Sequence, residues 1–230
     1  MNLNPFYDEL ETVLKESLTL LPEGGNVLDI GCGKGWLTRL LFNYLGANII
    51  GIDKNEVNID DCRVKAGNLP IEYKLMDMVD LSSDTFLTFY SLITCHNVLG
   101  YISNPTDQLH KMYSWLKPGG LLSIVVRTPS GRFAEIYERS ESINLAIKRY
   151  KDMKMYGSFG DIFNFYTQSS LTSMIEVAGF SVLKSQGLYS LEKYLPKGNE
   201  ILRSTLPELK NDNYFFHWVL CKKENNTRIN

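Results

Sequence analysis

The sequence predicts an α/β protein in which helices cover both faces of a mostly parallel sheet. Two observations carry this prediction. Short apolar segments alternate with helical segments through the first half of the chain, and a glycine-rich turn joins the first strand to the helix after it. Such alternation buries a parallel sheet between two helical layers, because the crossovers that join parallel strands are right-handed.

The first expected element is an N-terminal amphipathic helix. Apolar residues at helical spacing between Phe6 and Leu18 predict a helix from about Pro5 to Leu20. Strand and helix then alternate. The expected strands are Val27–Ile30, Ile49–Ile52, Ile71–Met76, Tyr90–Cys95 and Leu121–Val126, and the expected helices are Gly35–Tyr44, Lys54–Ala66 and Pro105–Leu116. Lys117–Gly120 is expected to be a structural turn.

After Arg127 the alternation stops, and the chain becomes rich in aromatic and basic residues. It resumes with an expected helix at Thr167–Ala178 and strand-like segments at Phe180–Leu183 and Tyr214–Leu220. We therefore expect a single domain over residues 1–230. Its expected parts are an N-terminal helix (1–24), a core (25–128), an insert (129–166), a C-terminal helix with strands (167–222) and a polar tail (223–230).

The composition is that of a soluble globular protein, with 44% hydrophobic and 22% charged residues. A net charge of −2 and a pI near 6.0 give no general attraction to nucleic acid or to an anionic membrane. No apolar run is long enough to span a bilayer, and the N-terminus lacks the features of a signal peptide. We expect a cytoplasmic protein with no membrane partner.

The cysteines and histidines are scattered along the chain. The four cysteines are Cys32, Cys62, Cys95 and Cys221, and no two of them form a C-x-x-C pair. This spacing argues against a disulfide framework and against a zinc site. We expect no metal site.

The most informative segment runs from Val27 to Trp36, with the sequence VLDIGCGKGW. Its glycines lack a Cβ, so a ligand can approach the backbone closely, and the helix that follows has free N-terminal amides. Asp53 ends the next expected strand, where its carboxylate can accept hydrogen bonds from both hydroxyls of a ribose. The segment therefore predicts a site for a nucleoside-containing cofactor.

Two classes of cofactor use this layout. A dinucleotide fingerprint, G-x-G-x-x-G, would require glycine at position 36, where this chain has Trp36. The glycines instead fall on alternate residues, Gly31, Gly33 and Gly35, and Asp29 precedes them. A bulky Trp36 would obstruct the close approach that a pyrophosphate needs, whereas S-adenosylmethionine carries no phosphate. The pattern favours S-adenosylmethionine.

The segment Asp29–Gly35 resembles the D-x-G-x-G-x-G loop of the class I, Rossmann-like, S-adenosylmethionine-dependent methyltransferases. Leu116–Gly120 is similar to the L-[KR]-P-G-G turn before the fifth strand of that family. The resemblance implies a sheet of seven strands with an antiparallel final hairpin. It also implies an enzyme that converts S-adenosyl-L-methionine to S-adenosyl-L-homocysteine.

The resemblance further implies roles for individual residues. The glycine loop would hold the methionine part of the cofactor, Asp53 the ribose, and Asp77 and Met78 the adenine. Cys95-His96-Asn97 would lie under the sulfonium. Lys54 borders this predicted site, and Tyr7, Trp36 and Tyr101 are candidates for walls around the sulfonium charge. The predicted cofactor-binding residues are Tyr7, Asp29, Gly31, Gly33, Gly35, Asp53, Lys54, Asp77, Met78 and Cys95.

Methyl transfer from a sulfonium needs an acceptor atom held in line behind the methyl group, at about 3–3.5 Å, with water excluded. A hydroxyl or protonated amine needs a base in addition, whereas a carboxylate does not. His96 is the candidate catalytic base, because it ends the fourth strand at the cofactor edge and its unperturbed pKa is near neutrality. Shaping the pocket is the alternative role for this residue.

The acceptor is open between two classes. The stretch from His96 to Pro105 is similar to bacterial methyltransferases that esterify a carboxymethoxyuridine at the tRNA wobble position. A tRNA enzyme needs a basic surface, yet residues 1–30 hold six acids and one lysine, and residues 127–157 hold seven bases and four acids. We therefore favour O- or N-methylation of a small molecule or peptide in a biosynthetic pathway, and we expect the insert 129–166 to be a lid over the acceptor. A non-catalytic cofactor-binding protein is the alternative of another class.

Overall fold

The computed structural model describes residues 2–81, 89–152, 154–156, 162–209 and 212–224. Its centre is a seven-stranded sheet in the order β3-β2-β1-β4-β5-β9-β8, with only β9 antiparallel to its neighbours. The strands are β1 (Asn26–Ile30), β2 (Ile49–Asp53), β3 (Ile71–Leu75), β4 (Tyr90–His96), β5 (Leu116–Arg127), β8 (Ser181–Ser190) and β9 (Tyr214–Lys222). The expected Rossmann-like fold with seven strands is confirmed.

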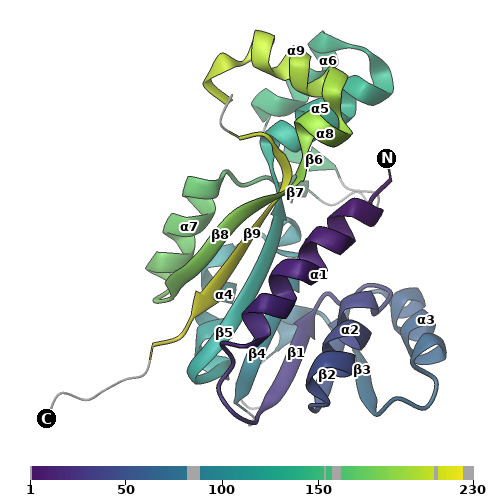
Figure 1. The fold of residues 1–230 in the computed structure, drawn as a ribbon, viewed down its shortest axis with the longest axis vertical. Helices are drawn as coiled ribbons and strands as arrows, with labels where there is room; N and C mark the ends of the chain where they lie inside the picture. The colour runs from purple at the N-terminus through teal and green to yellow at the C-terminus, as the bar shows by residue number, and fades with distance from the viewer. Residues whose placement is uncertain (1, 82–88, 153, 157–161, 210–211, 225–230) are drawn as a thin grey trace, which may run out of the picture.

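Helices cover both faces of the sheet. On one face, α1 (Asn4–Leu18) and α2 (Trp36–Leu45) bury apolar side chains such as Leu10 and Leu41 in a core with Val125 and Trp218. On the other face, α4 (Pro105–Trp115) and α7 (Gln168–Val177) pack over Ile93 and Ile124. A smaller cluster joins α3 (Glu56–Ala66) to β3. Figure 1 shows α1 crossing in front of the strands.

A group of helices lies beyond the carboxyl end of β5 (Figure 1). It comprises α5 (Pro129–Ser140), α6 (Ile143–Asp152), α8 (Leu191–Tyr194) and α9 (Pro196–Thr205), and we call it the helical cap. Thr128 caps the first helix of this group, α5, because its hydroxyl accepts a hydrogen bond from the Gly131 amide at 2.9 Å. The same hydroxyl donates a hydrogen bond to the Tyr214 carbonyl at 2.6 Å. The α5–α9 contact is close, since a Cβ at Gly198 would lie 2.5 Å from the Ala134 carbonyl oxygen.

The remaining elements are short. These are η1 (Met78–Asp80), η2 (Leu99–Tyr101), the β6–β7 hairpin (Lys154–Tyr156 and Ile162–Asn164) and η3 (Pro207–Leu209). Phe163 of β7 is buried, and a Cβ at Gly100 of η2 would lie 2.4 Å from its ring. The insert after β5 therefore returns to pack against the segment that follows β4.

Two sequence expectations differ from the structure. The expected strand Phe180–Leu183 is β8, which continues to Ser190, and α8 and α9 follow it before β9. Lys117–Gly120 lies inside β5, although the pairing with β4 shifts from Leu116 to Leu121 across this segment and Gly119 has φ 78°. The expected turn is therefore an irregularity within the strand. Positions 225–230 of the predicted tail, and positions 153 and 157–161 of the insert, lie outside the described residues.

Across the described residues, no helix has the length and apolar character needed to cross a membrane.

Candidate functional site

The glycine loop leaves β1 at the carboxyl edge of the sheet. Gly31, Gly33 and Gly35 all have positive φ, at 67°, 54° and 70°, a conformation that glycine adopts without steric cost. A Cβ added at Gly33 would meet no atom within 4 Å, so this backbone faces open space. The Gly33 amide donates a hydrogen bond to the Asp53 carboxylate at 2.9 Å. The loop is thus shaped for close approach by a ligand.

Asp29 lies beneath the loop and is almost completely buried. Its two carboxylate oxygens accept hydrogen bonds from the hydroxyls of Thr38 in α2 and Thr94 in β4, at 2.6 and 2.7 Å. Burial raises the pKa of Asp29 to about 6, although both threonine hydroxyls oppose the rise. The residue ties the first strand, the following helix and the fourth strand together below the loop.

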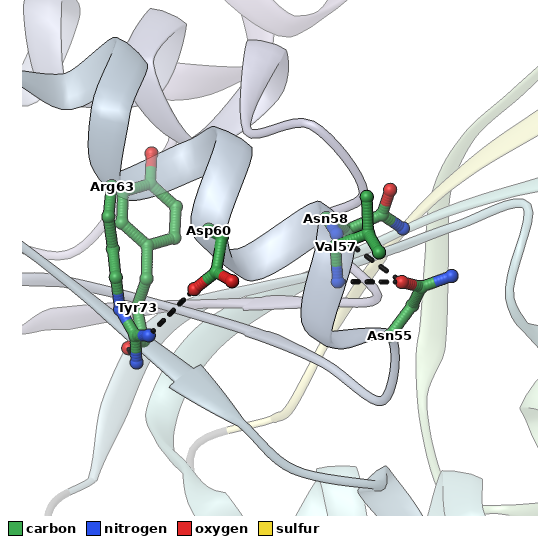
Figure 2. A network of polar contacts seen from close by, with 6 residues as sticks. All are labelled: Asn55, Val57, Asn58, Asp60, Arg63 and Tyr73. Atoms are coloured by element: carbon green, nitrogen blue, oxygen red, sulfur yellow. Dashed lines mark hydrogen bonds and ion pairs between the residues drawn. The ribbon is translucent and has the colours of Figure 1, made fainter.

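Asp53 ends β2 opposite the loop. One carboxylate oxygen accepts the Gly33 amide, and the other accepts the Asn55 amide at 2.8 Å and the Asn58 side chain at 3.4 Å. Asn55 in turn caps α3, because its side-chain oxygen accepts hydrogen bonds from the amides of Val57 and Asn58 (Figure 2). The Asp53 carboxylate is therefore held in place, and its Oδ2 keeps one acceptor position open to a ligand.

Two cavities of about 670 and 240 Å³ meet at this edge, and Gly31, His96 and Asn97 line both. The larger cavity runs between the ends of β2 and β4. The smaller lies between α1 and the glycine loop. A ligand with a nucleoside at one end and an amino acid at the other fits this pair of neighbouring cavities. Asp53 and Asp77 line the larger cavity, and Gly33 of the loop lines the smaller one.

Most of the residues predicted for the cofactor line these cavities. Asp53, Lys54, Asp77 and Met78 line the larger one, and Tyr7, Asp29 and Gly33 line the smaller. The Asp77 side chain also caps η1 by accepting the Val79 amide at 3.1 Å.

Gly35 and Cys95 are not brought into either cavity. A Cβ at Gly35 would lie within 3 Å of Arg39, Cys62 and Tyr73, so this glycine makes room for protein atoms. Cys95 is fully buried in the core on the opposite face of the sheet from Thr94 and His96, because side chains alternate along a strand.

His96 ends β4 where the cavities meet, and a chain of hydrogen bonds holds its ring. The Trp218 indole donates to the Ser123 hydroxyl oxygen at 2.9 Å, and this hydroxyl lies 2.8 Å from His96 Nε2. Since an indole can only donate, the serine proton is free to point at Nε2. In that arrangement the imidazole proton lies on Nδ1. Nδ1 is buried and has no hydrogen-bond partner among the described residues.

Burial also fixes the charge of the ring, because it lowers the pKa of His96 to about 3. The imidazole is therefore neutral near pH 7 and is a weak base. An unpaired N–H at the junction of two cavities is a hydrogen-bond donor available to a ligand. This geometry supports positioning by His96 more directly than proton removal.

Neighbouring residues complete the junction. Asn97 has φ 59°, which is unusual for a residue other than glycine, and its buried side-chain oxygen has no hydrogen-bond partner among the described residues. Tyr7 packs on Trp36 with ring centroids 4.7 Å apart, and Tyr101 meets Phe163 edge-on at 4.6 Å. These aromatic pairs stand beside the smaller and the larger cavity respectively.

Some of these functional residues were not predicted. Asn58, Ser123 and Trp218 belong to elements that the sequence located correctly, but no local pattern distinguishes them from other polar or aromatic residues there. Among the described residues, no group of three or more His, Cys, Asp or Glu side chains is placed to hold a metal ion.

The fold and the glycine-loop site define a cofactor-binding Rossmann-like enzyme, and comparisons with known proteins specify its class. Residues 6–185 match a family described as a methyltransferase domain. A ubiquinone biosynthesis O-methyltransferase of Coxiella burnetii is 29% identical over 191 residues, which cover 81% of this chain and 74% of that protein. One from Aeromonas salmonicida is 26% identical over 181 residues, covering 77% and 70%.

Solved structures share the fold at lower identity. An S-adenosylmethionine-dependent methyltransferase from Mesorhizobium loti has a TM-score of 0.62 at 18% identity, covering 92% of this chain and 97% of its own. The [4+2]-cyclase SpnF has a TM-score of 0.64 at 18% identity, covering 95% of this chain and 82% of its own. The fold alone therefore does not fix the reaction.

The family match covers most of the chain, so the protein belongs to the class I methyltransferase family. It is an S-adenosylmethionine-dependent methyltransferase. The cavities fit this cofactor, since Gly33 leaves open space and His96 and Asn97 present unpaired polar atoms between them.

The proposed ribose contact gives the first prediction. Asp53→Ala should weaken binding of S-adenosylhomocysteine by about tenfold to a hundredfold, because the ribose hydroxyls and the Gly33 amide both lose a charged acceptor. Titration calorimetry measures the change. Asp60→Ala, an exposed carboxylate of α3, is the matched control and should bind as the wild type does. Equal affinities of both variants would exclude the ribose role of Asp53.

Proposed function

We propose that this enzyme transfers a methyl group to an oxygen of a small organic acceptor in a biosynthetic pathway. The proposal is supported by the curated relatives, which are named ubiquinone biosynthesis O-methyltransferases. The observation that carries it is the junction of the two cavities, where the His96 donor stands between aromatic side chains. A narrow aromatic junction of this kind suits a small organic group.

When bound, S-adenosylmethionine supplies a methyl group that is already activated on a sulfonium. The chain's own residues then have to position and shield the reacting atoms. Tyr7 is 38% exposed and Tyr101 is 38% exposed, so both present ring surface to the cavities. The Tyr7–Trp36 pair narrows the smaller cavity, and aromatic faces favour a neighbouring positive charge.

His96 Nδ1–H is proposed to donate a hydrogen bond to the acceptor and to orient it. The Trp218–Ser123–His96 chain allows the serine proton to lie on the Nε2 side, and in that arrangement the Nδ1 donor is formed before the acceptor arrives. The neutral ring does not remove a proton efficiently, which favours an acceptor oxygen that is acidic or already ionised.

Charge supports a small acceptor over tRNA. Two bases of the insert, Arg132 and Arg139, both pair with Glu135, at 2.8 Å for Arg139. This pairing leaves the two guanidinium groups less available to the phosphates of a tRNA.

The role of His96 predicts a particular pH dependence. With a pKa near 3 the ring stays neutral from about pH 5 to pH 8, so kcat/KM should show no limb near 6.5 that belongs to His96. His96→Gln, which keeps a side-chain N–H, should retain more activity than His96→Ala, which we expect to lose about tenfold to a hundredfold. A limb near 6.5 that disappears in both variants would instead establish a general base.

The acceptor class is tested by isotope transfer and by salt. Cell extract incubated with the enzyme and methyl-labelled cofactor should yield a labelled small molecule detected by mass spectrometry. Filter binding should detect no retention of bulk tRNA at physiological salt. If tRNA were the substrate, raising salt from about 50 to 200 mM should cut its affinity by roughly a thousandfold for about six phosphate contacts. Label in the RNA fraction with that steep salt response would contradict the proposal.

A further inference from the structure

Arg127 is the last residue of β5 and lies at the same sheet edge as His96. His96 pairs with Val125 in the β4–β5 register, and Arg127 follows two residues later, about 7 Å along the strand. Side chains alternate along a strand, so Arg127 projects from the same face as Val125 and Ser123, which is also the face of His96. The Arg127 cation thus lies on the same face of the sheet as the His96 donor, on the neighbouring strand.

The Arg127 side chain lacks the carboxylate partner that several other arginines have. Arg63, Arg132, Arg139 and Arg203 each form an ion pair with a carboxylate, at 3.3 Å for Arg63. In the described part of the chain no ion pair involves Arg127, and its Nε is buried without a hydrogen-bond partner. A buried donor of a charged group is costly unless something satisfies it.

The surroundings of Arg127 hold it in place and give it a flat neighbour. Its guanidinium carbon lies 5.6 Å from the centroid of the Phe163 ring, and its carbonyl accepts the Tyr166 amide at 3.4 Å. Phe163 also meets the ring of Tyr101 edge-on, and Tyr101 lines the larger cavity. Arg127, Phe163 and Tyr101 therefore form one continuous cation–aromatic row that reaches the site.

We infer that Arg127 anchors a carboxylate of the methyl acceptor, so that the acceptor is an aromatic or otherwise flat organic acid. This inference rests on the proposed function and names its substrate class. A guanidinium offers two parallel N–H donors to a carboxylate, and the pair is stronger than a bond between neutral groups. Phe163 and Tyr101 supply flat apolar surface beside that charge.

The acid also agrees with the chemistry of His96. A neutral donor cannot compensate the charge of a carboxylate, but the guanidinium of Arg127 can, and the two groups lie on one face. The N–H of His96 is then left to orient the acceptor, while Arg127 selects acids over neutral molecules of the same shape.

The test compares one acid with its neutral isostere. Binding of 4-hydroxybenzoate and of 4-hydroxybenzamide to the enzyme saturated with S-adenosylhomocysteine is measured by titration calorimetry. We expect the wild type to prefer the acid by about tenfold or more, and Arg127→Gln to lose that preference. Arg127→Lys should retain part of it, because charge remains but the planar fork is lost.

Two controls separate this inference from folding and from the proposed function. Arg203→Gln removes an exposed cation of α9 and should keep the wild-type preference. Arg127→Gln should bind S-adenosylhomocysteine as the wild type does, since Arg127 lines neither cofactor cavity. Equal binding of acid and amide by the wild type, binding of neither at millimolar levels, or an unchanged preference in Arg127→Gln overturns the inference. Labelling of a neutral small molecule would also overturn it, while leaving the proposed function intact.

Discussion

The site depends on one buried carboxylate. Asp29 has no solvent contact of consequence, and its two oxygens take the hydroxyls of Thr38 and Thr94. These two threonines belong to α2 and β4, so the single side chain sets the distance between the glycine loop, the helix that follows it and the strand that carries His96. The Gly33 amide then reaches Asp53, which connects the same loop to β2. Both cavities take their shape from this arrangement.

The carboxylate is not there to stabilise the fold at neutral pH. Burial raises its pKa to about 6, which means that the folded state holds the ionised form less readily than water does. A well-packed apolar residue at this position would avoid that cost. The cost is consistent with a residue retained for the geometry of the loop, in the same way that the positive φ of Asn97 is a strained conformation at the neighbouring strand end.

Local patterns in the sequence were sufficient for the core and for much of the site. The alternating glycines and Asp53 identify the cofactor because a turn, a helix start and a strand end each leave a local pattern. The helices α8 and α9 were not predicted. Helix α8 has only four residues, and the role of Gly198 in α9 depends on Ala134 of α5, which is distant in the sequence. The donor role of His96 likewise depends on Ser123 and Trp218, which are distant in the sequence.

The structure also separates what the family shares from what this chain adds. The sheet, the loop and the Asp53 carboxylate form the proposed cofactor site, whereas the β6–β7 hairpin packs against Tyr101, which lines the larger cavity. A relative in fold can be a cyclase, so the reaction has to be argued from residues at the junction. His96 and Asn97 are the residues at that junction, and Arg127 ends the neighbouring strand. Each of the three has a buried polar atom that no described residue satisfies.

The central claim is that Asp29 organises the loop from a buried position, and the pH dependence of stability tests it most directly. The free energy of unfolding of wild type and Asp29→Asn is measured by urea denaturation from about pH 4 to pH 7. The unfolded carboxyl ionises near 3.8 and the folded one near 6, so the wild type should lose stability relative to the variant as pH rises through this window. The loss should reach about 3 kcal/mol and then level off above pH 6. Parallel curves for the two proteins would mean that Asp29 titrates as an exposed carboxyl does, and would contradict the account.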